Sequence, residues 1–187
     1  TLNNQSDRRD LFVDQKVTED RAIFSLRLDG LSPILPTSFN DGQKLSNRLN
    51  ILTFNAPLHS DESFDLLAIK FRAVCTDLIT GSLVLMDSGS LSNALRASSS
   101  VTFFLAPIKI DSLLLVDGGL VANIPVDVAK DNGGDFVIAV NTTSDLWPEK
   151  DLSAPWIVAD QIVSIPMKQN NAEQLNAADF VIKAIKK

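Results

Sequence analysis

The chain has 187 residues, of which 45% are hydrophobic and 21% are charged, and this composition is typical of a folded globular protein. Its net charge of −6 argues against electrostatic binding to nucleic acid, and it provides no general attraction to an anionic membrane. No apolar run approaches the roughly 18 residues that a membrane-spanning helix needs. We therefore expect no nucleic-acid partner. Any contact with a membrane surface must come from a local patch, and the location stays open between cytoplasmic, exported and membrane-associated.

The chain contains one histidine and one cysteine, so no internal disulfide can form. His59 lies in a polar stretch that is typical of a loop, and Cys75 lies in an apolar run that is typical of a buried thiol. With these two residues far apart in sequence, only carboxylates remain as metal ligands. The two adjacent glycines at 118–119 match neither common nucleotide-binding spacing. We expect no metal and no other cofactor.

The first half of the chain begins with an apolar and polar mixture over residues 22–28, which predicts a short strand. Asp41 is a candidate cap for a helix that runs to about Phe54. Leu45 and Leu49, with Leu52 three residues on, have the spacing of one buried helix face.

The segment 69–75 is predicted to be a strong strand. The turn signals of residues 76–81 and the apolar run 83–86 complete a predicted hairpin. Ser90 is a favourable N-cap residue for a helix that ends at Ser98.

Residues 113–116 are four consecutive apolar residues closed by Asp-Gly-Gly, a pattern that favours a buried strand. The glycines allow a positive φ or a close approach of the backbone. Pro125 suits the first turn of the helix that follows. A carboxylate at the carboxyl end of a strand lies where α/β sheets bind ligands, so Asp117 is a candidate general base or metal ligand. Asp-Gly is also an ordinary turn signal, and both interpretations stay open here.

Residues 136–140 form the next predicted strand, and the strand–helix–strand order over 113–140 predicts a parallel βαβ unit. A further helix is expected to begin near residue 154 and to bend or end at Pro166. The segment 178–182 is the last predicted strand.

Four blocks of sequence together resemble a known family. They are FRAVCTDLITG (71–81), SGSLSNALRAS (88–98), LLLVDGGLVANIPVDVA (113–129) and DFVIAVN (135–141). In order and spacing they are similar to the C-terminal half of a patatin-like phospholipase domain of the bacterial type. The resemblance implies a three-layer α/β fold with a central, mostly parallel sheet flanked by helices. It also implies that residues 1–187 are a single patatin-like domain.

The resemblance implies a lipid acyl hydrolase (a phospholipase or esterase) with a Ser–Asp dyad, a phospholipid or other acyl ester as substrate, and Asp117 as the catalytic base. The family carries its serine in a G-x-S-x-G motif and its oxyanion donors in a glycine-rich loop, and the printed sequence contains neither. We therefore expect the domain to lack its nucleophile-bearing part and this chain alone to be inactive. The alternative is a catalytically inactive fragment or pseudoenzyme that acts as a scaffold or binding module.

Other residues of these blocks have two interpretations each. Asp77 occupies a position where the family also carries an Asp, and a turn residue that binds nearby backbone N–H groups is favoured over a catalytic one. Arg96 is either an anion clamp or a structural partner. Phe103, Phe104 and Leu105 either line an acyl-chain pocket or, as Phe and Leu more often do, belong to the ordinary core.

Overall fold

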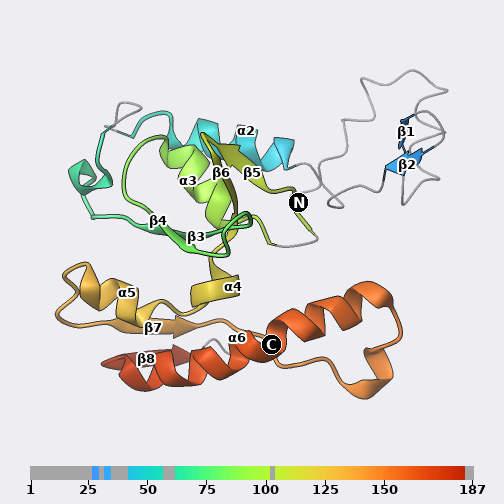
Figure 1. Ribbon diagram of the computed structural model, residues 1–187. Helices are drawn as coiled ribbons and strands as arrows, with labels where there is room; N and C mark the ends of the chain where they lie inside the picture. The colour runs from blue at the N-terminus through green and yellow to red at the C-terminus, as the bar shows by residue number, and fades with distance from the viewer. Residues whose placement is uncertain (1–26, 30–31, 35–41, 57–61, 102–103, 184–187) are drawn as a thin grey trace. The chain divides into compact units, whose positions relative to one another are not determined.

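The computed structural model describes residues 27–29, 32–34, 42–56, 62–101 and 104–183, which form helices and β-sheets (Figure 1). The chain divides into two compact units, each made of two segments. The first unit contains residues 1–73 and 86–116, and the second contains residues 74–85 and 117–187. The mixed α/β class predicted from the sequence is confirmed.

In the first unit, helix α2 (Gln43–Thr53) packs against helix α3 (Leu91–Ser98). Helix α3 begins where the sequence predicts. The Ser90 hydroxyl accepts a hydrogen bond from the Asn93 backbone N–H at 3.3 Å and so caps the helix.

Helix α2 also follows the predicted range, but its apolar face is less buried than its spacing suggests. Leu45 and Leu49 are half-buried, and Leu52 is exposed. The N-cap position is Gly42, which has φ +77°. The predicted cap, Asp41, lies outside the described residues.

The core of the first unit forms around Phe64, in the short 3₁₀ helix η1 (Phe64–Leu66). Phe64 is fully buried together with Ala73 and Ala94. The Phe71 ring lies 5.8 Å from the Phe64 ring, centroid to centroid, in a tilted arrangement. These aromatic contacts anchor the chain just before it enters strand β3.

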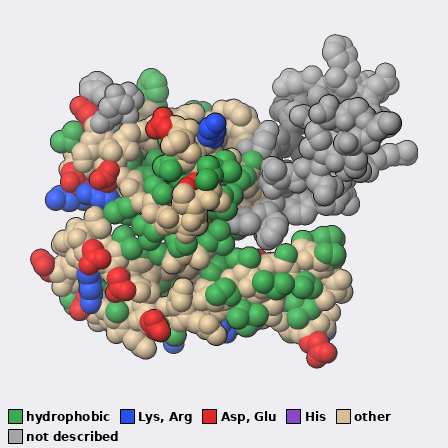
Figure 2. All heavy atoms as spheres, in the orientation of Figure 1, with side chains coloured by type: hydrophobic (Ala, Val, Ile, Leu, Met, Phe, Trp, Pro, Cys, Tyr) green, Lys and Arg blue, Asp and Glu red, His purple; other side chains and the backbone are tan. Residues whose placement is uncertain are grey.

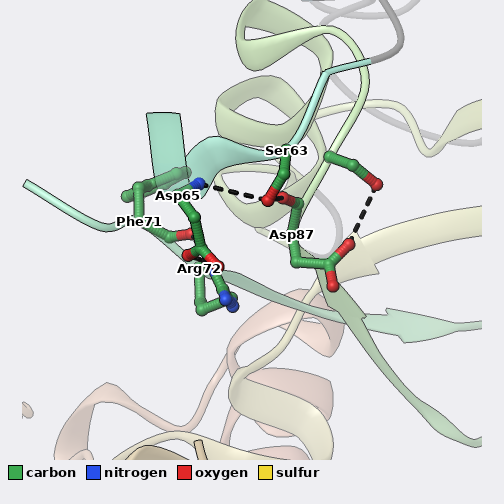
Figure 3. Close-up of polar contacts among 6 residues, drawn as sticks. Ser63, Asp65, Phe71, Arg72 and Asp87 are labelled. Carbon is green, nitrogen blue, oxygen red and sulfur yellow. Dashed lines mark hydrogen bonds and ion pairs between the residues drawn. The ribbon is translucent and has the colours of Figure 1, made fainter. Parts of the chain in front are cut away.

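A polar cluster surrounds this anchor (Figure 3). The Arg72 guanidinium lies 2.8 Å from an Asp65 carboxylate oxygen and lowers the pKa of that carboxyl group. The Ser63 hydroxyl accepts a hydrogen bond from the Asp65 backbone N–H at 3.2 Å and donates to the Asp87 carbonyl at 3.5 Å. The Ser63 hydroxyl contacts the backbone of Asp87 and not its carboxylate. This contact therefore stabilises the loop and does not have the geometry of a catalytic Ser–Asp dyad.

Four strands belong to one sheet, in the order β4-β3-β6-β5: β3 (Ala73–Asp77), β4 (Leu83–Met86), β5 (Ile108–Ile110) and β6 (Leu113–Asp117). Strand β5 is antiparallel to β6, with Ile108 opposite Leu115. The turn between β3 and β4 is closed by hydrogen bonds from Gly81 N–H to the Asp77 carbonyl and from Asp77 N–H to the Ser82 carbonyl. The predicted hairpin is confirmed. A separate antiparallel pair joins β1 (Arg27–Asp29) to β2 (Ser32–Ile34).

The strand predicted over residues 69–75 has the wrong bounds, because β3 begins only at Ala73 and continues to Asp77. Ile69 is 83% exposed, so its apolar side chain does not belong to a buried strand. Phe71 is used for packing against Phe64 instead of for strand pairing.

In the second unit, strand β7 (Ile138–Asn141) pairs in parallel with strand β8 (Phe180–Lys183), and helix α6 (Pro155–Ala177) connects them. The parallel βαβ unit predicted over residues 113–140 is therefore wrong in its pairing. Strand β7 pairs with the strand that follows it in the sequence, and β6 belongs to the other sheet. The last strand was predicted within two residues of its position.

Two short helices, α4 (Gly119–Ala122) and α5 (Val126–Asp131), pack against α6. The core here contains Ile124, Val126 and Ala139. The Lys130 ammonium group donates to the Ala177 carbonyl at the end of α6, at 2.6 Å. This contact satisfies one of the carbonyl groups that every helix leaves unpaired at its C-terminus.

Helix α6 has 23 residues and continues through Pro166. The sequence prediction was that this proline bends or ends the helix, and the helix does not end there. Its exposed apolar side chains include Trp156, Ile162 and Ile165, and Figure 2 shows hydrophobic side chains over α6 and the loop before it. Among the described residues, no helix combines the length and hydrophobicity that crossing a membrane requires.

Candidate functional site

Asp117 is the last residue of β6, and the chain enters helix α4 directly after it. Its side chain is half-buried, and one carboxylate oxygen accepts a hydrogen bond from the Gly119 backbone N–H at 3.2 Å. Its carbonyl accepts a hydrogen bond from the Thr76 hydroxyl on β3 at 3.1 Å. The carboxylate is thus held by its own loop, and the Asp117 backbone is held by β3, at the carboxyl end of a strand as the sequence predicts.

The two glycines after Asp117 are required for space and not for a positive φ. Gly118 has φ −65°, which any residue adopts, so the first of the two uses predicted for glycine, a positive φ, does not apply to it. A Cβ atom at Gly118 would lie only 2.5 Å from the Val74 carbonyl oxygen. A Cβ atom at Gly119 would lie 3.0 Å from the Met167 methyl group and 3.1 Å from the Asn123 side-chain oxygen. The expected close approach of the backbone is confirmed.

Burial raises the pKa of Asp117 above its ordinary value, although hydrogen bonds from the backbone N–H groups of Gly119 and Gly118 oppose the shift. The desolvated carboxylate is therefore a stronger base than a carboxylate in water. A base is useful near the pH at which it operates, so this shift brings Asp117 towards the range that proton transfer requires.

The same pKa shift predicts how stability depends on pH. The folded chain holds the Asp117 proton to a higher pH than the unfolded chain does. Between the two pKa values the folded state binds more protons, so the free energy of unfolding falls as pH rises through this window and stays lower above it. Asp117→Asn removes this loss, and we expect the variant to unfold at a higher temperature than the wild type at about pH 7, with the difference shrinking below about pH 4.

Thermal unfolding followed by circular dichroism over that pH range measures the effect. A variant that is less stable than the wild type at neutral pH would contradict it.

Cys75 is fully buried on β3, and burial, with a smaller effect of the Asp117 charge, raises the pKa of its thiol to about 11. A thiol with this pKa stays protonated at neutral pH and is a poor nucleophile. The interpretation of Cys75 as a small buried residue is confirmed.

The structure gives Asp77 and Arg96 local partners. The Asp77 carboxylate accepts hydrogen bonds from the backbone N–H groups of Ile79 and Thr80 and from the Thr80 hydroxyl, as expected of a turn residue. The Arg96 guanidinium is buried and donates to the Ser100 hydroxyl and to the Ala106 carbonyl. These contacts agree with the structural interpretation of both residues.

Of the remaining candidates, the structure describes Phe104 and Leu105. Phe104 is 61% exposed, so the interpretation as ordinary core is wrong for this residue, whereas Leu105 is half-buried. Phe103 and His59 lie outside the described residues. The described part of the chain contains no cluster of three His, Cys, Asp or Glu side chains that could hold a metal ion.

A cavity of about 580 Å³, which the sequence does not reveal, lies within the second unit. The loop after β7 and one side of α6 form most of its wall, and Asn123 at the end of α4 completes it. Asn123 and Met167 line this cavity and also lie against Gly119, the neighbour of Asp117 in the site. The cavity therefore begins next to the Asp117 loop.

Sequence comparison relates this geometry to known proteins. The sequence profile of the family described as patatin-like phospholipase matches residues 3–130, which include Asp117, Gly118 and Gly119. The chain belongs to the patatin-like phospholipase family. The resemblance found in the sequence blocks is confirmed, and the site residue proposed from it lies inside the matched part of this patatin-like chain.

The relatives of this patatin-like chain come from bacteria and mammals. It is 34% identical over 96 residues to an uncharacterized NTE family protein of Mycobacterium tuberculosis, and this match covers 49% of the chain and 27% of that protein. It is 26% identical over 144 residues to patatin-like phospholipase domain-containing protein 7 of the mouse, which covers 71% of the chain and 11% of that protein. It is 33% identical over 105 residues to human patatin-like phospholipase domain-containing protein 6, which covers 54% of the chain and 8% of that protein. In each case the match spans less than a third of the relative.

Proposed function

We propose that this chain supplies the aspartate base of a lipid acyl hydrolase with a Ser–Asp dyad, and that Asp117 is that base. The observation that carries the proposal is the half-buried carboxylate of Asp117, which ends a strand inside the family match, has a raised pKa and is held by the Gly119 N–H. The complete domain would have three layers with a mostly parallel central sheet, as the family resemblance implies.

In the proposed reaction Asp117 accepts the proton of a serine hydroxyl while the serine oxygen attacks the ester carbonyl. Asp117 then donates this proton to the oxygen of the departing alcohol, and an acyl-enzyme forms. In the second half Asp117 removes a proton from water while the water oxygen attacks the acyl group, and it returns that proton to the serine oxygen as the fatty acid leaves. The serine and the oxyanion donors belong to the G-x-S-x-G and glycine-rich elements of the family, which the 187 residues do not contain. The substrate is a phospholipid or another acyl ester, and exposed apolar side chains such as Ile162 on α6 offer contacts to a membrane surface.

The second candidate is a scaffold or binding module without catalytic activity. The exposed apolar side chains of α6 favour it, because an exposed apolar patch often marks a binding surface. In this case Asp117 is a residue of the turn alone and its raised pKa has no catalytic use.

Hydrolysis of an aryl ester by two proteins distinguishes the candidates. The first is the chain of residues 1–187, and the second is the same chain joined to a nucleophile-bearing segment of the family. We expect no hydrolysis by the first and saturable hydrolysis by the second, which a Ser→Ala change in the G-x-S-x-G motif abolishes. A joined protein that folds but remains inactive would favour the scaffold, and robust activity of residues 1–187 alone would contradict the proposed division of the dyad.

A further inference from the structure

The peptide group between Asp117 and Gly118 depends on contacts from outside its own loop. A Cβ atom at position 118 would lie 2.5 Å from the Val74 carbonyl oxygen, so this position needs a glycine. Glycine has access to more backbone conformations than any other residue, and it therefore does little to fix the peptide groups on either side of it. Helix α4, which begins after Gly118, has four residues and no side-chain cap hydrogen bond. Neighbouring elements must define the conformation of this loop.

Strand β3 supplies a direct contact of this kind. The Thr76 hydroxyl donates a hydrogen bond to the Asp117 carbonyl at 3.1 Å. Val74 lies two residues before Thr76, so the two side chains lie on the same face of the strand. The Val74 carbonyl and its Cγ1 atom limit the space at Gly118. Strand β3 therefore restricts both residues of the peptide group, one by a hydrogen bond and the other by packing.

The hydroxyl of Thr76 is the informative part of this side chain. Thr76 is 3% exposed, and a buried polar group is costly unless it forms a hydrogen bond. Valine has nearly the same shape and is at least as favourable in a strand, so packing alone does not require a threonine here. The bond to the Asp117 carbonyl is what threonine adds at this position.

The geometry of the peptide bond connects this hydroxyl to the Asp117 carboxylate. A peptide group is planar, so a hydrogen bond that fixes the Asp117 carbonyl also fixes the direction of the Gly118 N–H. The chain continues from this plane to Gly119, whose N–H donates to the carboxylate at 3.2 Å. The Gly118 N–H also supports the charged carboxylate. One bond to the carbonyl therefore acts on both backbone donors.

We propose that Thr76 is a positioning residue for Asp117: its hydroxyl fixes the Asp117–Gly118 peptide group and so keeps the backbone N–H donors directed at the carboxylate. This role in the reaction rests on the proposed function, because the orientation of Asp117 affects the rate only if Asp117 is the base. Without the hydroxyl, the peptide group can rotate away from this orientation. The alternative is a purely structural role, in which the hydroxyl pairs a carbonyl at the end of a strand and the carboxylate does not depend on it.

The two roles differ in what they predict for the Asp117 carboxyl group. Backbone N–H donors stabilise its charged form, so loss of the Thr76 hydroxyl should raise the pKa of Asp117 further. Two other titratable side chains lie on β3. The Cys75 thiol, with a pKa of about 11, stays neutral in this range, and the Asp77 carboxylate accepts hydrogen bonds within its own turn. Helix α4 carries no titratable side chain, and the α6 side chain next to Gly119 is the uncharged Met167.

A carboxyl ¹³C NMR titration of the 187-residue chain measures this pKa without any ester hydrolysis, and Asp117→Asn identifies the signal by its disappearance. We expect Thr76→Val to raise the pKa of Asp117 above the wild-type value. Thr76→Ser retains a hydroxyl and should leave the pKa at the wild-type value. Thr80→Val is the matched control, because it removes a hydroxyl that donates to the Asp77 carboxylate at 2.8 Å in the neighbouring turn, and it should also leave the pKa unchanged.

Catalysis gives the second measurement, in an active patatin-like domain that contains this chain. We expect Thr76→Val to lower kcat by about 10-fold with little change in KM, because the base is misplaced while the substrate still binds. The rise of kcat/KM with pH should move to higher pH in this variant. Thr76→Ser should restore both kcat and the pH profile, and Thr80→Val should not alter them.

The proposal is overturned if the pKa of Asp117 is unchanged or lower in Thr76→Val, if Thr76→Ser behaves like Thr76→Val, or if Thr80→Val has the same effect. Should Thr76→Val fail to fold, Thr76→Ala removes the hydroxyl without adding a methyl group and is measured in its place. A raised pKa with unchanged kcat has two meanings that Asp117→Asn separates. If Asp117→Asn is inactive, the positioning role is wrong; if it is active, the proposed function is wrong and the effect of Thr76 on the carboxylate stands.

Discussion

Replacing Asp117 by Asn is expected to lower kcat for ester hydrolysis by roughly 10²-fold or more, with little change in KM. The amide has the size of the carboxylate and can still accept the Gly119 N–H, but it cannot take the proton of a serine hydroxyl. The loss therefore falls on the proton transfer and not on substrate binding. The measurement is steady-state hydrolysis of an aryl ester and a phospholipid by an active patatin-like domain that contains this chain.

The pH profile makes the test specific for a base. Wild-type kcat/KM should rise with pH through the raised pKa of Asp117. The residual kcat/KM of the Asn variant should not show this rise. Asp135→Asn, at an exposed position of the same unit, is the matched control and should retain full activity. Near-normal kcat in Asp117→Asn would remove the assignment of Asp117 as the base.

Gly118→Ala is expected to destabilise the fold by about 1–3 kcal/mol and to lower activity with it. The added methyl group would lie 2.5 Å from the Val74 carbonyl oxygen and 2.8 Å from the Val74 Cγ1 atom. A carbonyl oxygen in a strand cannot rotate away, so either β3 or the Asp117 loop must move. Chemical denaturation of the variant, with ester hydrolysis measured in parallel, gives both effects.

Gly81→Ala separates crowding from loss of glycine flexibility. Gly81 has φ +72° in the hairpin turn, and a Cβ atom there would meet nothing within 4 Å. We expect Gly81→Ala to cost about 1 kcal/mol of strain and to leave activity unchanged, because the Gly81 N–H donates to the Asp77 carbonyl within the turn and not to the Asp117 loop. Equal effects of the two substitutions on activity would show that the space at Gly118 is not what positions Asp117.

Sequence reasoning predicted the local structure correctly where one short segment contains all the information. Four consecutive apolar residues end at Asp117, and the helix cap at Ser90 lies within three residues of its partner. It failed where tertiary contacts decide. Ile69 looks like a strand residue but is exposed, and β7 pairs with β8 instead of β6. Proline removes one hydrogen bond from α6, yet this helix continues through it and packs against α4 and α5.

The cavity could not be predicted from the sequence, for a different reason. Its wall comes from Asn123, the loop after β7 and α6, segments that are separated by intervening elements and carry no motif. Asn171, which lines the cavity, is one of many polar residues in α6, and only its burial distinguishes it from its neighbours. Polar periodicity in a sequence shows which residues avoid the core, but it does not show which of them face one another.

The contact between Gly118 and Val74 also limits how mutations near the proposed base can be compensated by a second substitution. The obstructing atom for any larger residue at position 118 is a backbone oxygen, which every amino acid at position 74 would carry. No second-site substitution at position 74 can therefore restore room for a side chain at position 118. At Gly119, by contrast, the atoms that a Cβ would meet belong to side chains: the Met167 methyl group at 3.0 Å, the Asn123 oxygen at 3.1 Å and an Asp117 carboxylate oxygen at 3.2 Å. The two adjacent glycines thus differ in what restricts them: position 118 is limited by the main chain of β3, and position 119 is limited by side chains, one of which is that of Asp117.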